Sequence, residues 1–318
     1  MVAARATLLA LAAAAALAAC TGVDQLVAED AGRELTEVPF FPQTIHQCGP
    51  AALATVLGAS GVDATPEQLA PLVYIPGRRG SLQVEMLAAA RSKGRIAYVL
   101  EPGFSQVQAE LAAGNPVLVL QDLGALGIRR WHFAVVIGHG IDRDLVILRS
   151  GTRRRLILRG NDFRRTWQAG GNWAAVVTPP DRPPATATGP GFVRALADAG
   201  RSLPGPALEA GHAAALARWP ADPLVLLANG NDAYANGRTA DAIRLYRQLL
   251  SIDPGNVAGR NNLANALLDA GCPQAALAEA RQAAAQLAPG AALEAPVRDT
   301  LAKAAAAAGG DESLCRPK

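Results

Sequence analysis

A 34-residue period in the last third of the chain constrains the fold more than any other feature. Glycine, alanine and proline recur at this spacing, in the pairs Gly237/Gly271, Ala242/Ala276 and Pro220/Pro254. Small side chains let two helices cross closely, and a fixed period of this length is typical of stacked helix pairs. The sequence therefore predicts an all-α repeat array over residues 189–318.

These repeats resemble the tetratricopeptide motif. Residues 223–256 follow its pattern, residues 257–290 follow it less fully, and residues 189–222 form a degenerate copy. The positions that carry the pattern in the clearest copy are Leu226, Gly230, Gly237, Ala242, Tyr246, Leu249 and Pro254. A last helix within 291–309 would cap the open apolar edge of the array. The resemblance implies a surface that recruits a protein partner or a substrate.

A second informative feature is a cysteine at the predicted start of a helix. Residues 43–52 read Gln-Thr-Ile-His-Gln-Cys-Gly-Pro-Ala-Ala, and a helical pattern covers 48–59. Pro50 suits the first helical turn, where a backbone N–H is not needed. The helix dipole and the unpaired N–H groups favour a thiolate at this position. We therefore expect Cys48 to be a nucleophile with a lowered pKa.

A cysteine nucleophile needs a base, and His132 is the best placed of the four histidines. It follows Trp131 and opens an apolar run that predicts a buried strand over 132–138. Packing of that strand would fix the imidazole in one orientation, as a general base requires. We expect His139 to be structural and His212, in an alanine-rich helix, to be solvated.

Together these residues resemble the papain-like double-glycine leader peptidases, especially their stand-alone relatives. The resemblance rests on a Gln upstream of Cys-Gly-Pro-Ala, a His-Phe strand, the Phe163-x-x-x-Trp167 element and a closing strand at 173–177. It covers residues 38–179. It implies an α+β papain-like cysteine peptidase domain, with helices first, strands later and the site between the two halves.

The resemblance also implies roles for individual residues. Cys48 would be the nucleophile, and His132 its general base and acid. Gln43 would donate its side-chain amide to the oxyanion, together with the backbone N–H of Cys48. Gln47 is a weaker candidate for that donor.

The residue that orients the imidazole departs from the family pattern. The family has Asp or Asn there, whereas this chain has Ser150 after the next predicted strand. A hydroxyl can accept a hydrogen bond from the imidazole, but it does not stabilise an imidazolium as a carboxylate does. Three carboxylates are alternative sources of that charge: Asp142, Asp144 and Asp122.

These features favour a cysteine peptidase that cleaves peptide bonds, and the resemblance to the leader peptidases implies small residues such as Gly-Gly before the scissile bond. Two alternatives stay open: a non-catalytic peptide-binding or scaffold lipoprotein with a degenerate peptidase fold, and a Cys/His amide-transfer enzyme. No cofactor is expected. His46 and Cys48 could supply two metal ligands, but no second Cys/His pair with zinc-like spacing follows, so no metal is expected.

The N-terminus predicts export. Residues 1–19 contain one charged side chain, Arg5, and an apolar stretch of Leu and Ala that is too short to span a membrane. The final Leu-Ala-Ala-Cys20 resembles the lipobox of bacterial lipoproteins, which implies lipid attachment at Cys20 and a tether over 20–37. Thr21 after that cysteine implies the cell envelope, at the periplasmic face of the outer membrane. The alternative is an ordinary signal peptide.

Three further features complete the predicted organisation. Prolines mark residues 180–188 as a linker between the two domains. A net charge of +3 argues against nucleic acid as a partner. In an oxidising periplasm Cys272 and Cys315 could form a disulfide. Arginines crowd residues 149–165, where we expect a solvated hairpin, or else a surface for anionic groups: Arg149, Arg153, Arg154, Arg155, Arg159, Arg164 and Arg165.

Overall fold

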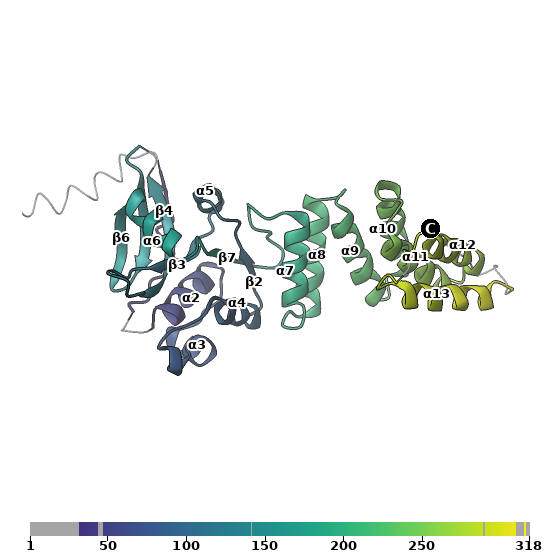
Figure 1. The fold of residues 1–318 in the computed structure, drawn as a ribbon, viewed down its shortest axis with the longest axis horizontal. Coiled ribbons are helices and arrows are strands. Elements are labelled where there is room, and N and C mark those ends of the chain that lie inside the picture. Colours follow the sequence, from purple (N-terminus) through teal and green to yellow (C-terminus); the bar gives the residue numbers. More distant parts are fainter. Residues whose placement is uncertain (1–31, 44–46, 141, 289, 310–314, 316–318) are drawn as a thin grey trace, which may run out of the picture. The chain divides into compact units, whose positions relative to one another are not determined.

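The computed structural model describes residues 32–43, 47–140, 142–288, 290–309 and 315 (Figure 1). The chain divides into two compact units. The first comprises residues up to Thr178 together with 184–186, and the second comprises 179–183 and 187–318. Cys20, the signal segment and His46 lie outside the described residues.

The first unit begins with helices and continues into a strand-rich half, as predicted. Its helices are α2 (Cys48–Ala59), α3 (Pro66–Val73), the short η1 (Pro76–Arg78), α4 (Gln83–Ser92), α5 (Phe104–Ala112) and α6 (Gly160–Ala169). Its strands are β1 (Arg33–Glu34), β2 (Ile96–Val99), β3 (Val117–Asp122), β4 (Trp131–Gly140), β5 (Leu145–Ser150), β6 (Arg153–Arg159) and β7 (Ala174–Thr178). The predicted helix over 48–59 is confirmed to the residue.

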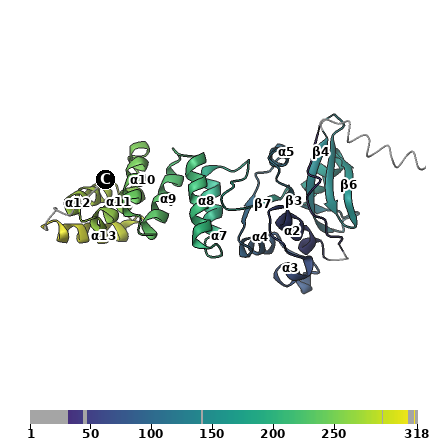
Figure 2. The same cartoon turned by 180° about the vertical axis from the view of Figure 1, so that it is seen from behind.

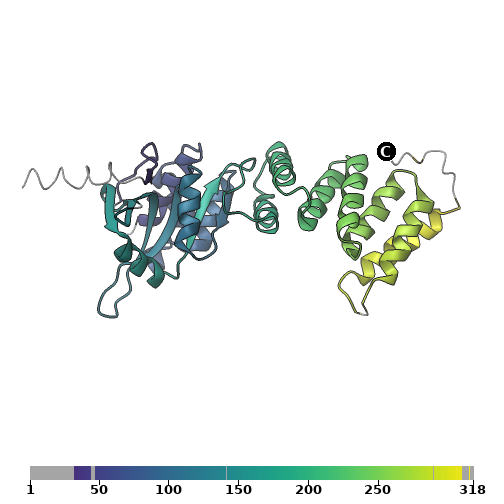
Figure 3. The ribbon, with the colours of Figure 1, turned by 90° about the horizontal axis from the view of Figure 1, so that it is seen from above.

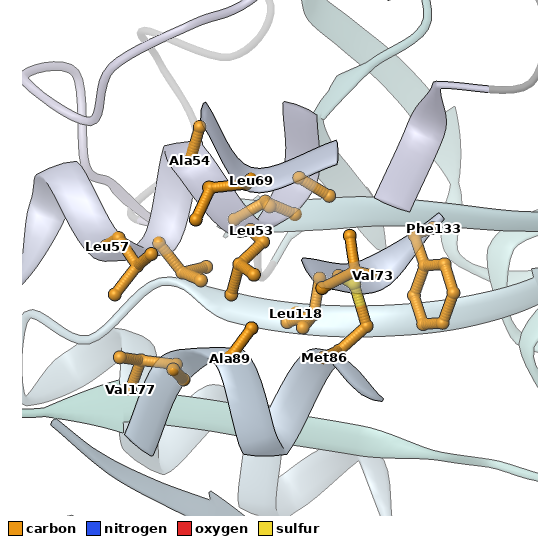
Figure 4. Packing of buried hydrophobic residues seen from close by; sticks show 14 of the residues in the cluster. Leu53, Ala54, Leu57, Leu69, Val73, Met86, Ala89, Leu118, Phe133 and Val177 are labelled. Atoms are coloured by element: carbon orange, nitrogen blue, oxygen red, sulfur yellow. The ribbon is translucent and has the colours of Figure 1, made fainter. Parts of the chain in front are cut away.

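All the strands join one antiparallel sheet in the order β2-β7-β3-β4-β5-β6, with β1 paired to β4. Side chains of β4 alternate between two cores, as expected for a strand buried on both faces. Phe133 lies in the core formed with α2 and α4, where Leu53 and Met86 pack (Figure 4). Val136 lies in the core formed with α5 and α6, beside Phe163. The sheet is thus fixed from both sides.

The arginine-rich segment includes the predicted hairpin, formed by β5 and β6, and Arg153, Arg154, Arg159 and Arg165 are exposed, but the other three arginines are not simply solvated. Arg149 is buried, and its guanidinium donates to the backbone carbonyls of Thr36 and Val38. Arg155 pairs with Glu34 at 2.8 Å, and Arg164 pairs with Asp144 at 2.6 Å. These arginines hold the N-terminal segment and the β4–β5 turn, because a buried guanidinium needs acceptors for its N–H groups.

The second unit is built of consecutive helices (Figures 2 and 3). They are α7 (Gly189–Ala199), α8 (Gly205–Arg218), α9 (Pro223–Ala235), α10 (Thr239–Ile252), α11 (Val257–Asp269), α12 (Pro273–Ala285) and α13 (Glu294–Ala307). Gly230 allows a close crossing of α9 and α10, since a Cβ there would lie 2.4 Å from the Tyr246 ring. Cys272 and Cys315 form the predicted disulfide.

One histidine of this unit differs from its prediction. His212 is half-buried on α8, and burial lowers its pKa. The expectation of a solvated side chain was wrong, because α8 packs against both α7 and α9. In the part of the chain that the structure describes, no helix has the length and apolar character to cross a membrane.

Candidate active site

Cys48 begins α2 and is half-buried with a free thiol. Gly49, the next residue, is buried against Ser81, because a Cβ at position 49 would lie 2.1 Å from the Ser81 Oγ. Pro50 follows in the first turn, and Ala51 is the first residue of the helix to donate back, to the carbonyl of Gln47. The Cys-Gly-Pro sequence thus places a thiol on an open helix end and brings the 80–82 segment close to it.

The pKa of Cys48 departs from the sequence-based expectation. Burial raises it above the usual range of a thiol, and the backbone N–H groups of Phe133, Gly49 and Cys48 itself offset only part of that effect. The prediction of a lowered pKa was wrong because removal of a thiolate from water outweighs the favourable helix end. The contribution of Phe133 shows that the sulfur lies against the backbone of the residue after His132.

His132 and Ser150 meet at one end of the sheet. His132 lies at the start of β4 and Ser150 at the end of the antiparallel strand β5, so the two residues lie at the same end of the pair. Their side chains are joined by a 2.9 Å hydrogen bond between His132 Nε2 and Ser150 Oγ. When Nε2 donates to Ser150, the lone pair of the imidazole is on Nδ1. In that tautomer Nδ1 is free to act as the base, and the contact with Ser150 orients the ring.

Two of the three alternative carboxylates lie at the other end of β4, whereas Asp122 pairs with Trp131 at the same end as His132. Asp142 and Asp144 follow the far end of β4, about 26 Å along the strand from His132 at a rise of about 3.3 Å per residue. Asp144 is paired with Arg164, and Asp122 accepts from the backbone N–H groups of Gly124 and Arg130.

The pKa of His132 is lowered to about 4, by burial and by the charge of Arg130. The imidazole is therefore neutral at pH 7, as a base must be before it accepts a proton. Among the described residues no hydrogen bond joins its ring to the Cys48 sulfur. A raised pKa for the thiol and a lowered pKa for the imidazole both favour the neutral forms of Cys48 and His132 at rest.

Gln43 is fixed by a reciprocal contact with the turn after β5. Its backbone N–H donates to the carbonyl of Gly151 at 3.0 Å, and its side-chain Oε1 accepts from the backbone N–H of Gly151 at 3.2 Å. Because Oε1 is engaged, the amide nitrogen Nε2 is the end of the side chain that faces other partners. That orientation suits a donor to an oxyanion.

These side chains line a single cleft of about 1180 Å³. The cleft contains Cys48, His132, Ser150 and Gln43, and Gln47 is exposed beside it without lining it. Its walls are otherwise formed by two loops, the β5–β6 turn, the end of α6 and two apolar residues of β3 and β4: Arg78, Arg79, Gly80, Ser81, Leu82, Gln83, Leu123, Arg129, Arg130, Trp131, Gly151, Thr152, Ala169, Gly170, Gly171, Leu120 and Phe133.

Four arginines of these walls were not predicted from the sequence. Arg78 and Arg79 come from the turn at η1, and Arg129 and Arg130 directly precede the strand of His132. Two Arg-Arg pairs at the ends of turns were visible in the sequence, but only the fold shows that both face one cleft. In the described part of the chain, no three His, Cys, Asp or Glu side chains gather as a metal site.

Family models match part of each unit. The model of the Peptidase_C39 like family matches residues 35–174, and a tetratricopeptide repeat model matches residues 233–303. A search of curated proteins found no match.

Two solved structures are similar to the first unit. One is described as a C39-like peptidase from Bacillus anthracis, with 18% identity over 47% of this chain and 98% of that chain, at a TM-score of 0.40. The other is the peptidase domain of Streptococcus ComA, a bifunctional ABC transporter in a quorum-sensing pathway, with 17% identity over 45% of this chain and 99% of that chain, at a TM-score of 0.37. On the evidence of the family models, the chain carries a C39-like peptidase domain of α+β fold, followed by tetratricopeptide repeats.

Proposed function

We propose that the cleft hydrolyses peptide bonds by cysteine catalysis, with Cys48 as nucleophile. The observation that carries the proposal is the convergence of four groups on one cleft: a thiol on an open helix end, an imidazole, the Ser150 hydroxyl that orients it, and an anchored amide at Gln43. The peptidase-type family of residues 35–174 supports the same conclusion.

In the first half of the reaction, His132 Nδ1 takes the thiol proton as the Cys48 sulfur attacks the peptide carbonyl. Gln43 Nε2 and the backbone N–H of Cys48 hold the oxyanion, at a benefit of about 3–4 kcal/mol for one such donor. The C–N bond then breaks, and the amine leaves with the proton from His132. A thioester to Cys48 remains.

Water releases the acyl group in the second half. His132 takes a proton from the water as its oxygen attacks the thioester, and it returns that proton to the sulfur when the C–S bond breaks. The free acid and the resting thiol are regenerated. Since the thiol is not ionised at rest, proton transfer to His132 accompanies the attack and depends on substrate that excludes water from the cleft.

The proposal is tested by peptide-library cleavage with the purified protein. We expect cleavage by the wild type and none above background by Cys48→Ala or His132→Ala, with reduced cleavage by Gln43→Ala. Ser92→Ala, on α4 outside the cleft, is the control. Cleavage that survives Cys48→Ala would contradict the assignment.

A non-catalytic binding module is the second candidate, and it is favoured by Ser150 in the place of a carboxylate and by the un-ionised thiol. The two candidates differ in one measurement. A binding module would bind library peptides without forming an adduct, whereas the peptidase would trap an acyl group on Cys48 that intact-mass spectrometry detects. Added amines would reveal a transferase by forming an amide product.

We extend the proposal to three finer features, each drawn from the sequence. The protein is anchored by lipid at Cys20 to the periplasmic face of the outer membrane, cleavage follows small residues such as Gly-Gly, and the repeats recruit a protein substrate or partner. Labelling with an alkynyl fatty acid tests the anchor, because Cys20→Ala would abolish it. Replacement of Gly-Gly by Leu-Leu in a cleaved peptide tests the specificity.

A further inference from the structure

We propose that the cleft selects peptides with acidic side chains beside the scissile bond. This specificity rests on the proposed peptidase function and is assigned to two pairs of arginines, Arg78/Arg79 and Arg129/Arg130. All four side chains are exposed and line the cleft that contains Cys48.

The charge of the cleft is entirely positive. Its lining includes four arginines and neither Asp nor Glu, and His132 is neutral at pH 7. None of the four guanidinium groups has a carboxylate within 4.0 Å among the described residues. The carboxylate nearest in sequence, Asp122, accepts from two backbone N–H groups of its own loop, and the charge of Arg129 contributes to lowering its pKa.

Several other arginines of the described chain are paired with carboxylates. Arg155 binds Glu34, Arg164 binds Asp144, and Arg260 binds Glu279 at 2.7 Å. The chain as a whole is nearly balanced, with 30 basic and 27 acidic residues. A cleft whose lining has four arginines and neither Asp nor Glu is therefore a local concentration of positive charge, and such a field attracts and orients an anionic ligand.

The chemistry of the ligand follows from the side chain. A guanidinium presents planar N–H donors that bind a carboxylate through two hydrogen bonds, which favours Asp and Glu side chains of an extended peptide. Arg129 lies over the ring of Trp131, with 5.3 Å between its guanidinium carbon and the ring centroid, so its position is partly fixed before the ligand arrives.

Arg130 also connects specificity to catalysis. Its charge lowers the proton affinity of His132, which lies two residues further along. A substrate carboxylate bound at Arg130 would offset that charge and make His132 a stronger base. An acidic substrate would thus raise kcat as well as lower KM, because it removes a repulsion that the imidazolium would otherwise meet.

The test measures binding to Cys48→Ala protein, in which turnover does not interfere. Fluorescein-labelled peptides that contain Asp and Glu are compared by anisotropy with matched peptides that contain Asn and Gln. We expect the acidic peptide to bind about tenfold more tightly at low salt, and we expect that preference to fall as salt is added.

Two double variants locate the effect. R78Q/R79Q and R129Q/R130Q should each weaken binding of the acidic peptide by about five- to tenfold and leave the neutral peptide within about twofold. The matched control is R159Q/R165Q, which removes two exposed charges of the same unit outside the cleft. Equal affinity for both peptides, or an equal loss in the control, would overturn the proposal.

Cleavage assays separate this inference from the proposed function. Wild-type protein that cleaves neutral and acidic peptides with equal kcat/KM, in a Cys48-dependent manner, overturns the acidic specificity alone. Protein that binds acidic peptides selectively but cleaves none contradicts the proposed peptidase function and supports the selection of acidic peptides.

The loop between β3 and β4, which carries Arg129 and Arg130, also exposes Leu126 and Ile128. Vesicles with anionic lipid therefore serve as a competitor. Vesicle binding that depends on these arginines without any peptide selectivity would overturn the proposal in favour of a membrane surface.

Discussion

The two units of this chain are held together over very different sequence distances. In the repeat unit, Asn262 donates to Asn231, 31 residues earlier, and Tyr234 donates to Asp269, 35 residues later. In the peptidase unit, Gly151 donates to Gln43 across 108 residues, and Arg155 reaches Glu34 across 121. Repeat arrays depend on neighbouring helices, whereas the cleft exists only when distant segments of the sheet are assembled.

From this contrast we expect substitutions in the repeat unit to lower the stability of nearby helices only. Substitutions around the cleft should instead lower the rate of peptide cleavage. Removal of a hydrogen bond or a disulfide in the repeats weakens one helix pair and its neighbours. Removal of a side chain around the cleft removes or misplaces a group that the proposed reaction needs. Substitutions in each unit, measured by both stability and peptide cleavage, separate the two kinds of effect.

The largest effect is expected from Cys48→Ala. Removal of the nucleophile should lower kcat/KM by about 10³-fold or more, because the remaining groups only bind and polarise the substrate. The measurement is peptide cleavage by the purified protein. Thermal unfolding should be unchanged in both units, since the thiol is only half-buried. A variant that unfolded early would show that Cys48 supports the fold.

Loss of the disulfide should affect the repeat unit alone. Cys272 and Cys315 are 43 residues apart, and closure of a loop of that length contributes about 4 kcal/mol to the free energy of unfolding. The C272S/C315S variant should therefore unfold its repeat helices at lower denaturant, measured by circular dichroism, while peptide cleavage is retained. A reductant should reproduce the effect in the wild type and add nothing in the variant. Loss of cleavage together with the loss of repeat stability would show that the effect is not confined to the repeat unit.

Glu110 tests the point where the chain leaves the peptidase unit. This buried carboxylate accepts from Asn115 Nδ2 at 2.7 Å, from the Thr186 N–H at 2.7 Å and from the Thr186 hydroxyl at 2.6 Å. Glu110→Gln would replace one acceptor oxygen by a donor, and we expect a loss of about 2–3 kcal/mol. Hydrogen exchange at residues 184–187 should accelerate.

The exposed Glu101→Gln is the matched control, because it removes the same charge from the same unit and leaves these hydrogen bonds intact. Equal acceleration in both variants would show that net charge, and not the Glu110 network, fixes the linker. No change in either would show that the segment is held by other interactions.

Sequence alone predicted what depends on local pattern. The start of the helix at Cys48, the strand at His132 and the 34-residue repeat each follow from periodicity and residue type over a short window. The resemblance to a family added Ser150 and Gln43, which the structure places with Cys48 and His132 in one cleft.

The remaining features depend on burial and on long-range packing, which a sequence does not display. The pKa of Cys48 was predicted in the wrong direction because the helix end is visible in the sequence and the desolvation around it is not. Arg149 was expected in solvent because its acceptors, at residues 36 and 38, are more than 100 residues away. The four arginines of the cleft were missed for the same reason.

The smallest effect, and the sharpest test of how the cleft is tuned, is expected at Ser150. Ser150→Ala would remove the hydrogen bond to His132 Nε2 and lower kcat/KM by about tenfold, since the ring loses the contact that orients it but keeps its packing. Ser150→Asp should instead raise the pKa of His132, because a carboxylate stabilises the imidazolium.

The pH profile measures this change. His132 must be deprotonated to act, so wild-type activity should fall only as pH drops through about 4. In Ser150→Asp the same decline should begin at a higher pH, and the profile of kcat/KM against pH measures the difference. An acidic limb that stays in place in both variants would show that Ser150 does not govern the imidazole.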